Sequence, residues 1–161
     1  MAEGITARNL KKVTLFNGLT GEELKQIAGL CNLRLVKSGE LSVKQGETQD
    51  SIHIVDKGRM GVEISLPSAP KDKKNMVLDT LGEGEIYSWS AMMKKPATAT
   101  VRAVEKTRVL DVSSDALLAL CEENSHIGYV VMKNLSVLIS SRLTRHRLAL
   151  LSAISGFGEG W

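Results

Sequence analysis

Between residues 33 and 112 the sequence consists of short apolar runs separated by glycines and polar residues. Apolar side chains alternate with other residues within these runs, as at Met60, Val62 and Ile64, and this period of two is typical of a β-strand with one buried face. Turn signals such as Gly46 and Gly58 separate the runs. Short strands joined by turns at intervals of about 8–12 residues predict an antiparallel sandwich, barrel or jelly roll. The predicted strands span 33–36, 41–43, 51–55, 60–66, 76–78, 100–104 and 108–112.

Helical signals flank the predicted strands on both sides. Residues 13–30 carry the first signal, in which Thr20 and Glu23 have the spacing of a capping box that satisfies free amides at a helix start. After residue 112 the apolar period returns to that of a helix, and a short helix is predicted at 116–122. Asn124 and Ser125 interrupt it, and residues 127–153 contain no proline and predict one long helix.

The order of these signals predicts an α+β, mainly β, fold in three parts. Residues 1–112 are expected to form an N-terminal helix and a jelly roll. Residues 113–154 are expected to form C-terminal helices that pack on the roll and supply the seam of a dimer, and residues 155–161 a flexible tail. A chain of 161 residues is long enough to bury the core of one such domain.

The composition disfavours several classes of protein. No apolar run approaches the roughly 18 residues that a membrane span needs, and the N-terminus carries no hydrophobic signal segment. We therefore expect a cytoplasmic protein without a membrane partner. The formal net charge of +3 is smaller than the basic bias of a dedicated nucleic-acid binder.

The sequence shows no constellation of residues that suggests an enzyme. Its histidines, His53, His126 and His146, lie far apart in the chain, so no metal site is expected. Cys31 and Cys121 lie among apolar residues without a further Cys or His at ligand spacing. We interpret both as buried thiols that act as small apolar side chains, and we expect no disulfide, metal or cofactor.

Several segments appear in an order that carries a family resemblance. The first helical segment reads LFNGLTGEELKQIA, and the strand region reads KSGELSVKQGETQDSIHIVDKGRMGVEI. LGEGE and PATATVRA follow, and RVLDVSSDALLAL leads into the last helices. From Leu15 to Leu151 the chain resembles the cyclic-nucleotide-binding domain of the catabolite-activator and cAMP-receptor family, with Gly39, Gly46 and Gly58 at that family's glycine positions. The resemblance implies a jelly roll between an N-terminal helix and two C-terminal helices, the second one long.

The resemblance also implies a ligand site, the phosphate-binding cassette, in residues 81–103. In such a cassette a short helix presents free amides to the cyclic phosphate, an Arg adds a charge-assisted hydrogen bond, and a Glu accepts a ribose hydroxyl. At the matching positions this chain has Ala97 in place of the Arg and Trp89 in place of the Glu. The ligand-binding residues implied by the resemblance are Gly84, Tyr87, Ser88, Trp89, Ser90, Ala97, Thr98 and Ala99.

Two interpretations stay open for the side chains of this cassette. Trp89 either stacks on an aromatic ligand or fills the space that the missing groups leave, and packing is the commoner role of a large aromatic side chain. Ser88, Ser90 and Thr98 either bind an anion through hydroxyls and amides or cap a helix and a turn.

The long helix carries two candidate surfaces. Apolar residues at spacings of three and four predict a seam for a homodimer. In the family this helix lines the dimer interface and its later turns approach the ligand, so the resemblance implies that His146 and Arg147 contact the pocket. Arg142 and Arg145 are interpreted as an exposed basic face. The predicted seam consists of Met132, Leu135, Ile139, Leu143, His146 and Leu150.

These observations favour a non-catalytic regulatory module in signal transduction, in which a small-molecule ligand is sensed and the long helix passes the signal to a partner protein. Cyclic nucleotide binding is expected to be lost or altered. One alternative is a ligand-free dimerisation or protein-interaction module, and another is a domain that binds cAMP or cGMP through other contacts. Only 10 residues follow Leu151, too few for a helix-turn-helix, so no DNA-binding domain is expected.

Overall fold

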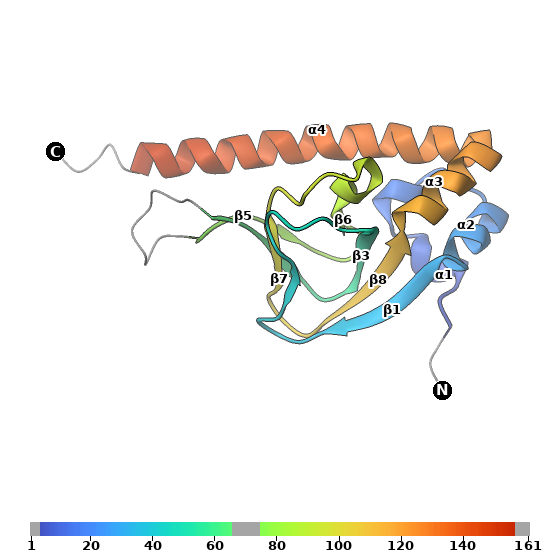
Figure 1. The fold of residues 1–161 in the computed structure, drawn as a ribbon, viewed down its shortest axis with the longest axis horizontal. Coiled ribbons are helices and arrows are strands. Elements are labelled where there is room, and N and C mark those ends of the chain that lie inside the picture. The colour runs from blue at the N-terminus through green and yellow to red at the C-terminus, as the bar shows by residue number, and fades with distance from the viewer. Residues whose placement is uncertain (1–3, 66–74, 157–161) are drawn as a thin grey trace.

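The computed structural model describes residues 4–65 and 75–156. Two four-stranded antiparallel sheets form a β-roll, with strand orders β1-β8-β3-β6 and β2-β7-β4-β5 (Figure 1). The predicted antiparallel jelly roll is thus confirmed. The strands are β1 (Cys31–Val36), β2 (Leu41–Val43), β3 (Ser51–Lys57), β4 (Met60–Ser65), β5 (Asn75–Leu81), β6 (Ile86–Tyr87), β7 (Thr100–Ala103) and β8 (Thr107–Ser113).

Helices lie at both ends of the chain. They are α1 (Ala7–Leu10), the 3₁₀ helix η1 (Thr14–Phe16), α2 (Gly21–Ala28), the 3₁₀ helix η3 (Trp89–Met93), α3 (Ser114–Glu123) and α4 (Ser125–Gly156). The sequence reading missed α1 and the two-residue strand β6, and it made β5 too short. Helix α4 continues through residues 155–156, which were predicted as tail, while the rest of that tail and Leu66 of the predicted fourth strand lie outside the described residues.

The predicted capping box starts α2. The Thr20 hydroxyl accepts a hydrogen bond from the backbone amide of Glu23 at 3.3 Å, and the Glu23 carboxylate accepts one from the amide of Thr20 at 2.9 Å. Two amides that would otherwise lack partners at the helix start are satisfied in this way. Helix α2 begins only at Gly21, directly after Thr20. The earlier residues of the first helical signal form η1 and a loop.

The predicted interruption at Asn124 separates α3 from α4. Asn124 has extended backbone angles, φ −119° and ψ 101°. Its side-chain oxygen accepts hydrogen bonds from the amides of His126 at 3.1 Å and Ile127 at 3.2 Å. A single residue therefore ends one helix and caps the next, which lets α4 turn back over the roll.

Alternate residues of strand β3 face two separate apolar cores. Ile52 and Ile54 belong to a core shared with the helices, which we call the helical core, while Val55 belongs to the interior of the roll, which we call the roll core. The helical core also includes Leu10, Leu24, Ile27, Leu110, Leu117, Ile127 and Val131. The roll core includes Val36, Val43, Met60, Val62, Leu81, Tyr87, Val101 and Val109.

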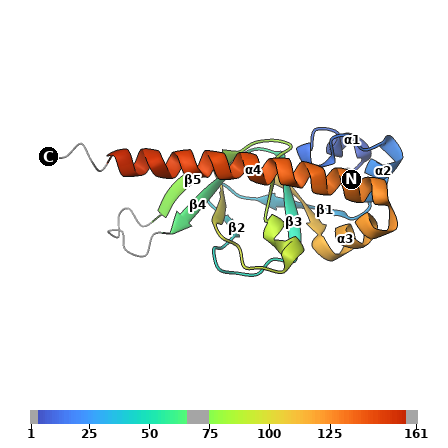
Figure 2. The same ribbon diagram turned by 90° about the horizontal axis from the view of Figure 1, so that it is seen from above.

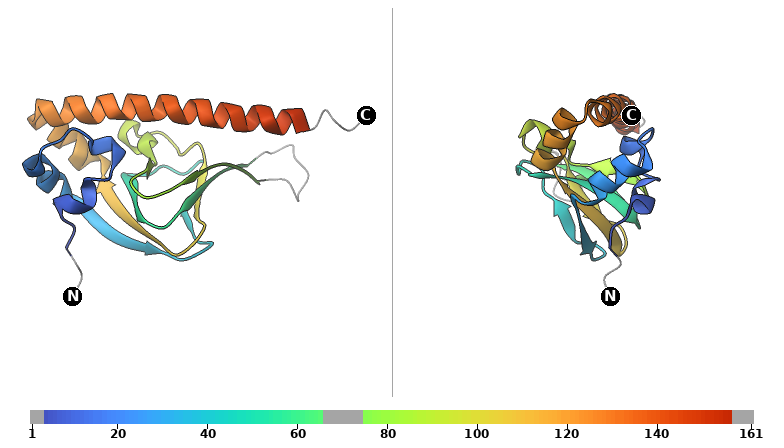
Figure 3. Two further views of the ribbon diagram at one scale, coloured as in Figure 1. Left: turned by 180° about the vertical axis from the view of Figure 1, so that it is seen from behind. Right: turned by 90° about the vertical axis from the view of Figure 1, so that its right-hand side faces the viewer.

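Helix α4 runs along the whole length of the molecule, as two perpendicular views show (Figures 1 and 2). Its first turns contribute Ile127 and Val131 to the helical core, and Asn134 donates hydrogen bonds to the backbone carbonyls of Leu15 and Asn17 at 3.0 and 2.8 Å. Its later turns lie over β5 and the roll, and its C-terminal end projects away from the N-terminal helices (Figure 3). Among the described residues, no helix has the length and apolarity needed to cross a bilayer.

Candidate functional site

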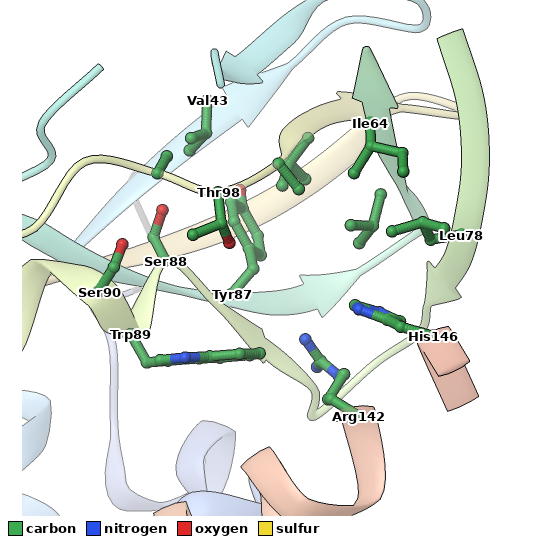
Figure 4. A pocket seen from close by; sticks show the side chains of 14 residues that line it. Val43, Ile64, Leu78, Tyr87, Ser88, Trp89, Ser90, Thr98, Arg142 and His146 are labelled. Atoms are coloured by element: carbon green, nitrogen blue, oxygen red, sulfur yellow. The ribbon is translucent and has the colours of Figure 1, made fainter. Parts of the chain in front are cut away.

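A small pocket lies between the roll core, η3 and α4. Its volume is about 130 Å³, and the side chains that line it come from the cassette, from the four strands of one sheet and from α4 (Figure 4). Lining residues are Val43, Val62, Ile64, Leu78, Tyr87, Ser88, Trp89, Ser90, Ala97, Thr98, Ala99, Val101, Arg142 and His146. We call this the cassette pocket.

The structure brings seven of the eight cassette residues implied by the resemblance to the wall of this pocket. Gly84 is the exception, because it does not line the pocket and has a structural role instead. Its φ of +83° favours glycine, and a Cβ atom there would lie 2.2 Å from the carbonyl oxygen of Lys12. Gly84 thus allows the loop before β6 to pack against the N-terminal segment.

Ser88 holds a left-handed backbone conformation, with φ 65° and ψ 31°, directly before η3. Such a conformation costs a non-glycine residue roughly 1–2 kcal/mol and tends to persist where the surrounding structure requires it. The Ser88 hydroxyl lines the pocket and is buried without a hydrogen-bond partner among the described residues. It does not cap η3. The geometry at Ser88 therefore favours anion binding by its hydroxyl over the capping of a helix.

Trp89 and Arg142 meet at the border between cassette and helix. The Arg142 guanidinium carbon lies 5.1 Å from the centre of the Trp89 ring, within the range of a cation–π interaction. Trp89 is partly buried and lies along one side of the pocket rather than across it (Figure 4). The indole therefore narrows the cavity and still leaves part of it open.

Arg142 was expected on an exposed face, and the structure shows the opposite. The residue is only 2% exposed, and its side chain points from α4 toward the pocket. Its Nη2 atom donates a hydrogen bond to the carbonyl oxygen of Ile86 at 2.6 Å. Arg147, which the resemblance placed at the pocket, is exposed and does not line it. The positions of Arg142 and Arg147 follow from the helical period. Five residues correspond to a rotation of about 140°, so Arg147 points away from the pocket when Arg142 points toward it.

Two carboxylates lie behind Arg142 and are shared with Arg145. Arg142 is 3.9 Å from Asp79 and 3.8 Å from Glu85, whereas Arg145 is 3.2 Å from both. Burial lowers the pKa of the Arg142 guanidinium, and the carboxylates of Glu85 and Asp79 act in the opposite direction. The cluster links β5 and the loop before β6 to α4 through charge.

His146 lies one helical turn after Arg142 and also lines the pocket. Its Nε2 atom is 3.6 Å from the nearer carboxylate oxygen of Asp79 and has no hydrogen-bond partner among the described residues. Burial lowers the pKa of His146 below its ordinary value of 6.5, although Asp79 opposes that effect. The ring is therefore mainly neutral at neutral pH and can donate or accept a hydrogen bond.

The floor of the pocket rests on a polar network inside the roll. The Tyr87 hydroxyl is 2.7 Å from that of Ser42, and burial raises the pKa of Tyr87 to about 12. His53, 5% exposed, lies with its ring centre 4.9 Å from that of Tyr87 and hydrogen-bonds Asp111 at 2.6 Å. Arg34 donates two hydrogen bonds to the same carboxylate, at 2.7 and 3.1 Å. Sequence reading missed this network, because its members come from separate strands.

The predicted dimer seam divides in the structure. Leu135 packs against the helical core, and His146 lines the cassette pocket. Ile139 is partly buried, while Met132, Leu143 and Leu150 are exposed on α4. Four of the six predicted seam residues are therefore left to contact a partner helix, and Leu135 and His146 are not among them. The four are Met132, Ile139, Leu143 and Leu150.

The cysteines are partly buried rather than fully buried, and both are free thiols. Burial raises the pKa of Cys31 to about 12 and also raises that of Cys121, so neither is a ready nucleophile at neutral pH. Within residues 4–65 and 75–156, no group of three or more His, Cys, Asp or Glu side chains could hold a metal ion.

Comparison with known proteins identifies the same architecture. Residues 33–124 match the family model of the cyclic nucleotide-binding domain. A suspected potassium channel protein of Rhodopseudomonas palustris is 29% identical over 118 residues, which are 73% of this chain and 27% of that protein. The chain thus spans about a quarter of the length of this curated relative.

Solved structures agree in fold. A cyclic nucleotide-binding domain from Methylobacillus flagellatus matches with a TM-score of 0.78 at 21% identity, covering 94% of this chain and 83% of that one. The catabolite activator protein of Thermus thermophilus matches with a TM-score of 0.71 at 25% identity, covering 88% of this chain and 63% of that one.

Proposed function

The chain belongs to the cyclic nucleotide-binding domain family, and we propose that it is a sensor module whose pocket takes a small ligand other than a standard cyclic nucleotide. The family is regulatory rather than catalytic. The observation that carries the proposal is the lining of the cassette pocket, where Trp89 and Ala97 stand in place of the two ionic groups that hold a cyclic nucleotide.

The loss of both ionic groups is large in energy. A hydrogen bond to a charged group contributes roughly 1.5–3 kcal/mol. Two such losses cost roughly 3–6 kcal/mol, which corresponds to about two to four decades in affinity. A dissociation constant of about 1 μM would rise to roughly 0.1–10 mM.

The size of the pocket points in the same direction. Pockets for drug-sized ligands commonly have volumes of about 300–1,000 Å³, and the cassette pocket has about 130 Å³. The Trp89 indole lies along one side of this cavity (Figure 4). A ligand smaller than a nucleotide fits this cavity better.

Titration calorimetry with cAMP and cGMP on the full chain tests the proposal. We expect no saturable binding at micromolar concentration and no rise in unfolding temperature at saturating levels, since any ligand of the folded state must stabilise it. Tight one-to-one binding of either nucleotide would contradict the proposal and favour a cyclic-nucleotide receptor with other contacts.

A second candidate is a ligand-free dimerisation or interaction module. The observation that favours it is the exposed apolar surface on α4, where Leu143 is 68% exposed and Met132 and Leu150 lie on the same side. Burying such residues between two helices is a common source of dimer stability. Sedimentation at increasing concentration and ligand screening together separate the two candidates. A dimer that no ligand stabilises favours the interaction module, and a chain that stays monomeric at high concentration argues against it.

A further inference from the structure

Arg142 has the features of a buried cation that is prepared for an anion. Its side chain lies in the wall of the cassette pocket, and its Nε atom has no hydrogen-bond partner among the described residues. Nε is 3.9 Å from Asp79 and Nη2 is 3.8 Å from Glu85, both beyond hydrogen-bond distance, and Nη2 donates its hydrogen bond to the carbonyl oxygen of Ile86. A buried charge is costly unless it is paired and hydrogen-bonded, so the unused Nε donor of an arginine in the cavity wall favours an anionic ligand.

The charges around Arg142 favour a ligand with a single negative charge. Arg145 approaches both Asp79 and Glu85 more closely than Arg142 does, so these carboxylates are shared between two guanidinium groups. Both carboxylates would repel a ligand with two or more negative charges more strongly than a ligand with one, so a single charge is favoured. His146, on the next turn, and the unpartnered Ser88 hydroxyl offer further hydrogen bonds without adding a second fixed charge.

Apolar side chains form most of the remaining lining, and Ser90 and Thr98 add hydroxyls to it. Val62, Ile64, Leu78 and Val101 line the pocket from one sheet, and Figure 4 shows Ile64 and Leu78 on the side away from Trp89. These apolar side chains favour a hydrocarbon body and give no partners for ribose hydroxyls or for the polar edge of a base. The small volume of the cavity limits that body to a short branched or aromatic group.

We propose that the cassette pocket binds a compact amphipathic monoanion, such as a small aromatic or branched-chain carboxylate, and that Arg142 of α4 holds its anionic group in place of the cation that the cassette lacks. This proposal rests on the proposed function of the chain as a small-ligand sensor. Because Arg142 belongs to α4 and also contacts Trp89, the ligand acts directly on the helix, and the signal needs no relay through the roll.

The test compares ligands that differ only in charge. Benzoate and isovalerate are titrated into the full chain by calorimetry and thermal shift at neutral pH, with benzamide and isovaleramide as neutral partners of the same shape. We expect at least one carboxylate to bind roughly tenfold or more tightly than its amide, as a charge-assisted hydrogen bond requires. This comparison uses the unaltered protein and does not depend on the folding of a variant.

Variants then identify the cation. Arg142→Gln is expected to lose the preference for carboxylate over amide, and Arg142→Lys to keep a weaker one, because lysine retains the charge without the planar fork. Arg147→Gln, which changes an exposed arginine on the same helix, is the matched control and is expected to keep the full preference.

Four results would contradict this inference or the proposed function on which it rests. If carboxylate and amide bind equally well, the pocket does not recognise a negative charge, although the chain could still be a small-ligand sensor. If Arg142→Gln and Arg147→Gln lose the preference for carboxylate to the same extent, Arg142 is not the cation that holds the ligand. The absence of any response to both carboxylates would also reject the ligand class, and tight binding of cAMP instead would reject the proposed function itself.

Discussion

The guanidinium of Arg142 lies 5.1 Å from the centre of the Trp89 indole, so α4 and the cassette are in direct contact beside the pocket. The two residues stand on segments that are 53 positions apart in the sequence. The resemblance implies that Trp89 stands where the family's cassette has an acidic group, and we propose that Arg142 supplies a cation from the helix. Under that proposal the charged group of the site lies on α4 rather than in the cassette.

Restoring the two ionic groups of the cassette is expected to restore cyclic nucleotide binding. In Trp89→Glu combined with Ala97→Arg, the affinity for cAMP should rise above that of the natural chain by as much as about two to four decades. Removal of the indole also enlarges the cavity. Calorimetry measures the gain, and each single variant serves as a control that should recover only part of it. A folded double variant that binds no cAMP would contradict this view of the site.

Gly84→Ala is expected to destabilise the fold by about 2–4 kcal/mol, because it combines a strained φ with a steric overlap. The new Cβ would lie 2.2 Å from the carbonyl oxygen of Lys12, at a φ of +83°. Gly21→Ala is the control, since a Cβ at the start of α2 meets no atom within 4 Å. Urea unfolding should show little change or a slight stabilisation for that control. Equal midpoints for the two variants would refute the close approach.

The network below the pocket predicts a loss of stability for Asp111→Asn. Two hydrogen bonds from Arg34 and one from His53 converge on this carboxylate, so its removal leaves partly buried partners unsatisfied. We expect a cost of about 1–3 kcal/mol in unfolding free energy. Glu105→Gln breaks the exposed pair with Arg59 and should change stability by no more than about 0.5 kcal/mol. A similar small effect for both would show that the network adds little.

The contact between α2 and α4 predicts sensitivity to acid. The amide of Thr20 and the ring of His126 hydrogen-bond the Glu23 carboxylate and lower its pKa below the ordinary 4.5. A carboxylate with a lower pKa in the folded state stabilises the fold above its unfolded pKa, and the contribution is lost as pH falls through the folded value. The stability difference between the natural chain and Glu23→Gln should therefore shrink below pH 4.5.

Urea unfolding across that pH range measures the effect of Glu23. Glu22→Gln provides the control, because Glu22 is an exposed neighbour whose ion pair with Lys25 lies on the helix surface. Its stability difference from the natural chain should vary much less with pH. A pH-independent difference for Glu23→Gln would argue against the lowered pKa.

Self-association through α4, if it occurs, should depend on one side of the helix. Leu143→Glu places a charge on the exposed apolar surface and is expected to shift sedimentation toward the monomer. Val137→Glu is the matched control, because Val137 is similarly exposed and lies about 120° away around the helix. Equal effects of the two variants, or none from Leu143→Glu in a dimeric chain, would exclude this surface as the seam.

Most of the fold could be predicted from the strand-and-turn pattern, because a period of two residues and glycine turns are local properties of the sequence. The capping box at Thr20 and the break at Asn124 were predicted for the same reason. Strand β6 could not be predicted, since it has only two residues and is defined by its partners His53 and Ile54 across the sheet. Local signals do not report such long-range pairing.

The pocket residues of the cassette could be predicted from the family resemblance, because they lie in one short segment. The pocket residue Arg142 of α4 could not be predicted in this way. Arginine recurs on α4 at residues 142, 145 and 147, and apolar residues occur around much of the helix, so the sequence does not fix which side faces the roll. A shift of a few residues in the assumed phase exchanges Arg142 for Arg147. The network of Asp79, Glu85 and Arg145 depends on that phase and was missed with it.

Helix α4 is held at its first turns by the helical core and at Arg142 by the pocket, and beyond that its residues are mostly exposed. The 15 residues from Arg142 to Gly156 form a rigid rod of about 21 Å. Such a rod is a lever with its pivot beside the cassette pocket. A tilt of about 10° at Arg142 would carry the far end through about 4 Å over this length.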